Sequence, residues 1–117
     1  MPYQALLDEL LRTVHDAEGA LLLDGTGEVV LGSGAMDERQ RLLGAYEGIA
    51  LSHVRRVARR HGLGSVQYML WRHREGSVIL RPLKDDYFLV VQLGVAANVA
   101  HSLLKTAWLQ QRIDQEL

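Results

Sequence analysis

The chain lacks cysteine and any long apolar run, and both absences restrict what it can be. Its 117 residues include no Cys, which excludes disulfide scaffolds and thiolate metal sites and fits a reducing compartment. No apolar stretch approaches the roughly 20 residues that a membrane-spanning helix needs. The N-terminal segment, MPYQALLDELL, carries acidic residues and no basic region, so a signal peptide is not expected. We therefore expect a cytoplasmic protein without a membrane span.

The chain also lacks an excess of charge. It has 13 Lys and Arg against 14 Asp and Glu, a formal net charge of -1, which gives no overall attraction to nucleic acid or an anionic membrane. The basic segment HVRRVARRH, residues 53–61, lacks the interleaved stacking residues of a nucleic-acid site. We interpret its arginines as a solvated or partner-facing side of a helix, favoured near the helix C-terminus by the dipole.

Catalytic motifs are missing as well. The segment DGTGE, residues 24–28, has glycines but no lysine or following helix of a phosphate loop, and it is predicted to be a hairpin turn. Nucleophile-elbow and metalloprotease motifs are absent. His53 and His61 lie eight residues apart, too far for two ligands on adjacent helical turns. We therefore predict a protein that is not an enzyme and holds neither a metal nor a cofactor.

The residues that are present predict one α+β domain over residues 1–117. Hydrophobic residues make up 48% of the chain, enough for a core at this length. Periodicity and turn signals predict helices at 3–17, 37–61 and 96–116, a hairpin at 19–34, and three further strands at 65–73, 77–83 and 87–93. The order α-β-β-α-β-β-β-α is typical of a five-stranded, mostly antiparallel sheet covered by helices.

The segment PLKDDYFLVVQL, residues 82–93, predicts the centre of that sheet. Its second half is apolar at successive positions, so both faces of the strand need cover. Asp85 and Asp86 precede it, and they are interpreted as residues of a solvated turn.

Two helices carry further predictions. The second has an apolar face, expected to be core: Leu42, Leu43, Tyr46, Ala50, Val54 and Val57. The opposite face carries Gly44, Gly48, Leu51 and Arg55. Glycines inside a helix cost about 1 kcal/mol each relative to alanine, so we predict that a second backbone approaches this face; the alternative is neutral drift of the two glycines. The predicted third helix carries five apolar residues on one face: Ala96, Val99, Ala100, Leu103 and Ala107.

The third strand predicts an exposed sheet edge. Met69 and Trp71 alternate with Tyr68 and Leu70, so neither face is polar, and pairing with a second copy would protect such an edge. We therefore predict an isologous dimer. The residues assigned to the dimer or partner interface are Gly44, Gly48, Leu51, Arg55, Arg59, Met69 and Trp71.

Three segments together resemble the roadblock family of dynein light chains and their bacterial relatives. They are GALLLDGTGEVVLGSG, residues 19–34, GSVILRPLKDDYFLVVQL, residues 76–93, and a helix beginning near NVAHSLL. The resemblance implies a roadblock/profilin-like sheet with the second helix on one face and the first and third on the other. It also implies homodimers in which second helices lie side by side and third strands pair, here residues 44–59 and 66–73.

The resemblance implies a function too. Bacterial members of the family typically partner a small Ras-like GTPase, so we expect a homodimeric adaptor that binds and regulates such a GTPase by activation or recruitment. Another roadblock protein or a sensor kinase are further expected partners. The alternative is a small-molecule-sensing or scaffolding domain of a signalling complex, for which Gln67 and Gln92 are the best polar candidates on strands.

Overall fold

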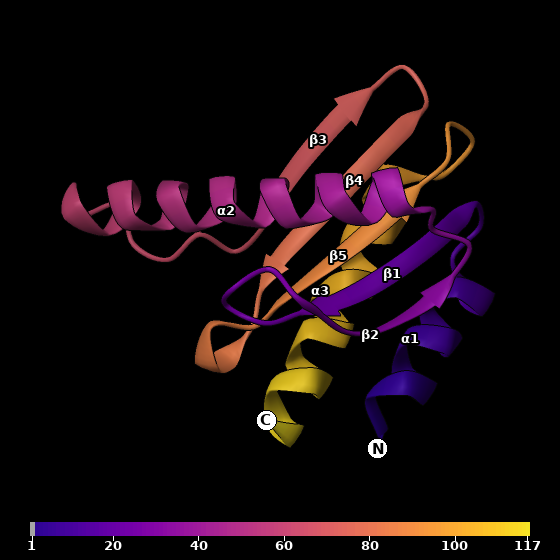
Figure 1. The fold of residues 1–117 in the computed structure, drawn as a ribbon, viewed down its shortest axis with the longest axis horizontal. Helices are drawn as coiled ribbons and strands as arrows, with labels where there is room; N and C mark the ends of the chain where they lie inside the picture. The colour runs from indigo at the N-terminus through magenta and orange to yellow at the C-terminus, as the bar shows by residue number, and fades with distance from the viewer. Residues whose placement is uncertain (1) are drawn as a thin grey trace.

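The computed structural model describes residues 2–117, which form the helices and strands in the predicted order (Figure 1). The elements are α1 (Pro2–Thr13), β1 (Ala17–Leu23), β2 (Val29–Gly34), α2 (Glu38–Arg60), β3 (Met69–His73), β4 (Gly76–Pro82), the 3-10 turn η1 (Lys84–Asp86), β5 (Phe88–Leu93) and α3 (Val99–Glu116).

The five strands form one antiparallel sheet in the order β2-β1-β5-β4-β3. Strand β5 is central, with Val90 opposite Leu21 of β1 and Leu80 of β4. All six β5 residues are buried, so the prediction of a central strand is confirmed. The exposed η1 turn before it holds Asp85 and Asp86 with positive φ. Strands β2 and β3 form the two edges.

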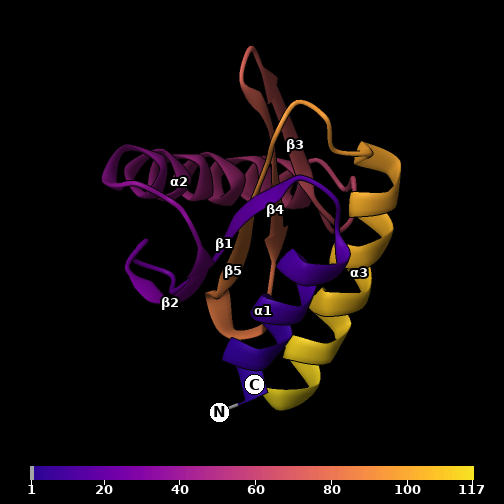
Figure 2. The same cartoon turned by 90° about the vertical axis from the view of Figure 1, so that its right-hand side faces the viewer.

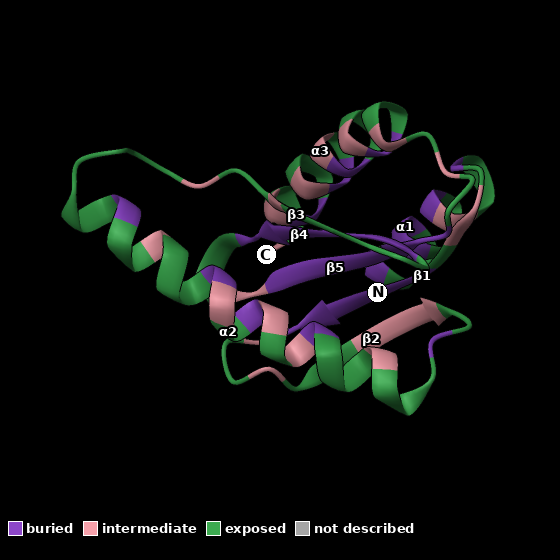
Figure 3. Ribbon diagram, turned by 90° about the horizontal axis from the view of Figure 1, so that it is seen from above, coloured by how far each residue is buried: buried purple, intermediate pink, exposed green. Residues whose placement is uncertain are grey.

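Helices cover both faces of the sheet (Figure 2). Strand residues such as Leu22, Leu89 and Val91 pack with α1 and α3 on one face. Their neighbours Leu21 and Val90 pack under α2 on the other. This alternation is what a strand buried on both sides requires, and Figure 3 shows the resulting band of buried residues through the middle of the molecule.

Helix α1 has one buried apolar side. Five apolar residues at three- and four-residue spacing, in the helix and just after it, are buried: Tyr3, Leu6, Leu7, Leu10 and Val14. The helix ends at Thr13 and not at residue 17, because Asp16 adopts a positive φ of 61°. The Asp16 carboxylate there accepts a hydrogen bond from the Ala96 amide at 2.8 Å, which ties the start of β1 to the segment before α3.

The β1–β2 hairpin is closed by Asp24. One of its carboxylate oxygens accepts hydrogen bonds from the Thr26 hydroxyl at 2.6 Å and from the Thr26 and Glu28 amides at 2.9 and 3.1 Å. These bonds, the Thr26 side chain first, lower the pKa of Asp24. Gly27 has a φ of 88°, a conformation that glycine adopts without strain. The predicted hairpin is confirmed.

The predicted ends of α2 are confirmed, but the prediction of which side faces the core is wrong. The helix lies within the predicted range 37–61, and Asp37 and Gln40 form a capping box at its start. The buried residues, however, are Gly44, Gly48, Leu51 and Ala58, whereas Leu42, Leu43, Tyr46, Val54 and Val57 are exposed. The predicted inner face of α2 is therefore the outer one. The glycines do allow a close approach, but the neighbour is this chain's own sheet, because a Cβ on Gly48 would overlap the Phe88 ring.

Helix α3 begins at Val99 and not at residue 96, and Leu103 of the predicted apolar face packs partly buried against the core. The buried residues are Ser102, Thr106, Leu109 and Ile113, whereas Ala96 precedes the helix and Ala100 is exposed. The two polar residues are buried because they are paired. The Ser102 hydroxyl donates to the Asn98 carbonyl at 2.8 Å, and the Thr106 hydroxyl accepts from Arg81 at 2.9 Å.

The two glycines of α2 give a matched pair of substitutions. A Cβ at Gly44 would meet Val90 Cγ1 at 3.4 Å, an ordinary contact. Gly44→Ala should therefore raise the free energy of unfolding by about 0.5–1 kcal/mol through helix propensity. Gly48→Ala should lower it by about 1–3 kcal/mol, because the Phe88 ring must move. Urea denaturation at matched protein concentration measures both, and equal effects would contradict the buried orientation of α2.

Candidate protein-interaction surface and basic groove

The outer side of α2 exposes a continuous set of large apolar side chains. We call these residues the α2 stripe, and each is between 42% and 61% exposed: Leu42, Leu43, Tyr46, Ile49, Val54 and Val57. Exposed apolar residues are normal when scattered, but a set gathered along one helix marks an interaction site. Its residues have the spacing of a buried helix face, and for this reason the sequence predicted that this side of α2 belongs to the core.

Strand β3 adds an open sheet edge with exposed apolar residues. Leu70 and Trp71 in the strand, and Tyr68 just before it, are 36–42% exposed. Within residues 2–117, β3 pairs only with β4. In Figure 1 α2 crosses the sheet beside the start of β3 and continues beyond this edge. Edge strands of this kind pair readily with another chain, so the α2 stripe and the β3 edge form one candidate protein-interaction surface.

The structure separates the predicted interface residues into two groups. Gly44, Gly48 and Leu51 are buried on the side of α2 that faces the sheet. The half-buried Met69 packs against the apolar cluster that contains Leu51. Their burial within this chain corrects the prediction that Gly44, Gly48 and Leu51 lie on an outward surface. Trp71 is exposed on β3, and Arg55 and Arg59 line a groove beside the C-terminal half of α2. An interface role for these three stays a prediction.

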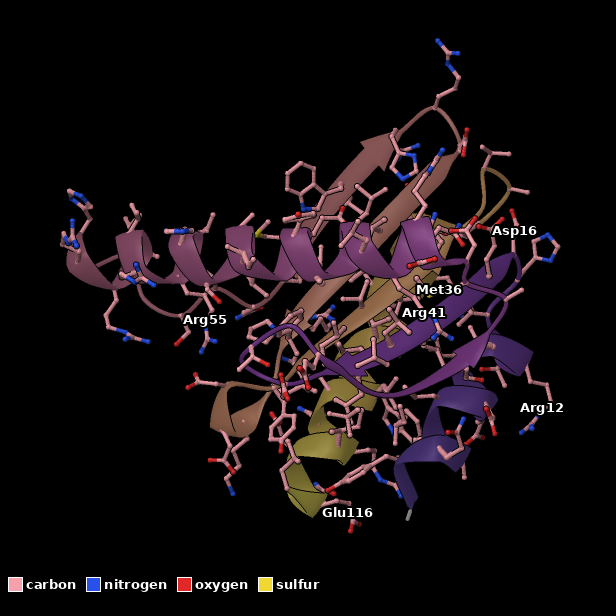
Figure 4. The ribbon with its side chains drawn as sticks, viewed as in Figure 1. Arg12, Asp16, Met36, Arg41, Arg55 and Glu116 are labelled. Atoms are coloured by element: carbon pink, nitrogen blue, oxygen red, sulfur yellow. The ribbon has the colours of Figure 1, made fainter. Side chains whose placement is uncertain are left out.

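That groove, called the basic groove below, has a volume of about 940 Å³. It is bounded by the C-terminal half of α2, by the segment 62–67, and by the end of β4 together with α3. Its polar and charged lining includes Arg55, Arg59, Arg81, Lys84, Gln111 and Asp114. Figure 4 shows Arg55 pointing from α2 towards the side of the η1 turn.

Arg81 on β4 is the residue that sequence reasoning missed. It is only 4% exposed. Its Nε donates to the Thr106 hydroxyl at 2.9 Å, and its Nη2 donates to the Leu103 carbonyl at 2.8 Å. The Tyr68 ring centre lies 4.9 Å from its guanidinium carbon. Burial lowers the pKa of Arg81. The available signal was an arginine inside SVILRPL, an otherwise apolar strand.

The two glutamines proposed for small-molecule binding do not come together. Gln92 is buried on β5, and its side-chain amide donates to the Leu93 carbonyl at 3.4 Å. Gln67 lines the basic groove, and its backbone carbonyl accepts from Arg81 at 3.3 Å. Within residues 2–117, no three potential metal-ligating side chains form a group. Over the same residues, no helix has the length and apolar character needed to cross a bilayer.

The sheet, its helices and the exposed surface define a small α+β domain with one apolar helix face and one open sheet edge. The model of the Roadblock/LC7 domain matches residues 3–93, and the chain belongs to this family. The resemblance to the roadblock family and the predicted α+β fold class are therefore confirmed.

Several solved structures have folds similar to that of this chain. The Roadblock/LC7 domain from Streptomyces avermitilis has a TM-score of 0.83 and 20% identity over 96% of this chain and 94% of that one. Myxococcus xanthus MglB has a TM-score of 0.84 and 14% identity over 98% and 94%. Myxococcus xanthus MglC has a TM-score of 0.69 and 22% identity over the full length of both chains. No curated protein sequence matches the chain.

Glu47, a half-buried residue of α2, gives a test by pH. Burial raises the pKa of its carboxyl group above the ordinary value. Ionised Glu47 therefore opposes folding at neutral pH, and this cost is absent below about pH 4, where the group is protonated in both states. Glu47→Gln should raise the melting temperature at pH 7 and leave it unchanged at pH 3.5. An equal change at both pH values would contradict the assignment.

Proposed function

We propose that this protein is a homodimeric, non-enzymatic adaptor that binds and regulates a small Ras-like GTPase. The proposal of a dimer is supported by the exposed apolar side chains of the α2 stripe together with the open β3 edge. A stable protein–protein interface covers about 800 Å² on each partner, which a helix of 23 residues and an adjacent strand are long enough to provide.

A twofold arrangement suits both parts of this surface. In an isologous dimer each element meets its own copy, so α2 stripes would lie side by side while β3 strands pair across the axis. Pairing would cover the unpaired backbone groups of β3 and the side chains of Leu70 and Trp71 together. Met69 would support this interface from within, because it packs against the cluster beneath α2.

The GTPase part of the proposal is supported by family membership. The chain belongs to the roadblock family, whose bacterial members typically partner such GTPases, and its fold is similar to those of MglB and MglC. Activation and recruitment are both compatible with an adaptor. Another roadblock protein in place of the second copy, or a sensor kinase, would use the same surface.

The dimer is tested by placing a charge on the α2 stripe. Tyr46 is 61% exposed, so Tyr46→Asp should leave the fold intact and weaken self-association by about 2 kcal/mol, a typical loss for an aromatic anchor. Leu104 on α3 is 73% exposed, and Leu104→Asp is the matched control. Analytical ultracentrifugation at low micromolar concentration measures both. A monomeric wild type, or equal dissociation of the two variants, would contradict the interface.

Binding of a GTPase is tested by co-elution. The purified dimer is mixed with candidate Ras-like GTPases loaded with GDP or a GTP analogue. Arg55, Arg59 and Arg60 should steer association, because rim charges act mainly on the association rate. Arg59→Glu should slow association at low salt without unfolding the protein. Arg12→Glu on α1, far from Arg55 in Figure 4, is the control. Unchanged association of Arg59→Glu would refute the steering role, and co-elution independent of nucleotide would refute the regulatory one.

A further inference from the structure

The basic groove concentrates positive charge in a chain that has none in excess. Arg55 and Arg59 line both this groove and a smaller hollow of about 230 Å³ beside the η1 turn. The two hollows together are lined by five cationic side chains and two acidic ones: Arg55, Arg56, Arg59, Arg81 and Lys84 against Asp86 and Asp114. This local excess of three positive charges contrasts with the net charge of -1 for the chain.

Arg81 fixes part of this charge inside the protein. Its hydrogen-bond acceptors are the Thr106 hydroxyl, the Gln110 side chain and the carbonyls of Gln67 and Leu103. All four are neutral. Within residues 2–117 the one ion pair closer than 4 Å joins Arg39 and Glu75. Neutral acceptors satisfy the N–H groups of a buried guanidinium and leave its charge uncompensated, so the wall of the groove stays positive.

Arg55 and Arg59 stand one helical turn apart and present further guanidinium groups to the groove. Arg55 follows Leu51 by four residues, which places it on the side of α2 that faces the sheet at Leu51. At Arg55 that side faces the groove instead. Neither arginine has a carboxylate within 4 Å among the described residues. Of the two acids, Asp114 is engaged by the Lys84 backbone amide at 2.8 Å.

We propose that the basic groove binds a small molecule that carries a phosphate or diphosphate group, with Arg55 and Arg59 as the contacting side chains. Guanidinium groups bind phosphate oxygens in a bidentate manner and are favoured for this recognition. Ser65 and Gln111 line the same groove and provide neutral donors. Its volume of about 940 Å³ is in the range of small-molecule sites. No residue of the α2 stripe or of β3 lines the groove, so the proposed dimer and this site use different side chains.

Pyrophosphate is the probe that tests this site. It is titrated into the wild-type protein at a fixed ionic strength of about 0.15 M, followed by calorimetry and by amide chemical shifts. Saturable binding is expected, with shifts centred on residues 62–67 and on Gln110 and Gln111. The double variant Arg55→Gln/Arg59→Gln should bind about tenfold more weakly or worse, whereas Arg12→Gln should bind as the wild type does.

Three results would overturn the proposal. The first is the absence of saturable binding, and the second is equal weakening by Arg12→Gln, which would indicate general charge attraction. The third is a polyglutamate peptide of matched charge that competes equally well, since the groove would then recognise an acidic protein segment. Ultracentrifugation of the double variant is run in parallel. An intact dimer that no longer binds pyrophosphate separates failure at this site from failure of the proposed dimer.

Discussion

The close approach of Gly48 to Phe88 determines which side of α2 lies on the outer surface of this domain. The Phe88 ring occupies the space next to the Gly48 backbone, where a side chain would otherwise lie. This close approach fixes which side of α2 faces the sheet. A helix rotated by half a turn would place Tyr46 and Ile49 against β5, where the room for them is already taken. The apolar stripe is therefore turned to solvent by packing, against its own hydrophobicity.

The sequence predicted the architecture well because the signals for it are local. The capping box at Asp37 and Gln40, the Asp24 hairpin and the doubly apolar β5 each depend on a few neighbouring residues. The rotation of α2 and α3 about their axes depends instead on contacts with residues far away in the sequence. In α2 the apolar periodicity predicts a core face, whereas the side that is buried carries two glycines and Leu51. An apolar face indicates burial, but it does not say whether this chain or another covers it.

The buried side of α3 could not be predicted for a related reason. Ser102 and Thr106 are polar residues, and the periodicity of apolar residues does not mark them as buried. Their hydroxyls are satisfied by Asn98 and by Arg81 from β4, and such pairing removes most of the cost of burying them. Because Arg81 and Thr106 lie 25 residues apart, neither helical periodicity nor strand alternation reveals the pair. The basic groove could not be predicted for the same reason, since it draws its lining from α2, β4 and α3.

The two edges of the sheet differ in a way that bears on how large an assembly can grow. At the β2 edge the Gln4 side chain donates to the Gly32 carbonyl at 3.1 Å, and Asp8 accepts from the Ser33 hydroxyl. Helix α1 thus obstructs one edge, while β3 presents the other freely. A sheet extended through β3 alone ends after a single addition, because both outer edges of the pair are then obstructed strands. The domain would be self-limiting, and fibre-like stacking through its strands would be blocked by two polar side chains of its first helix.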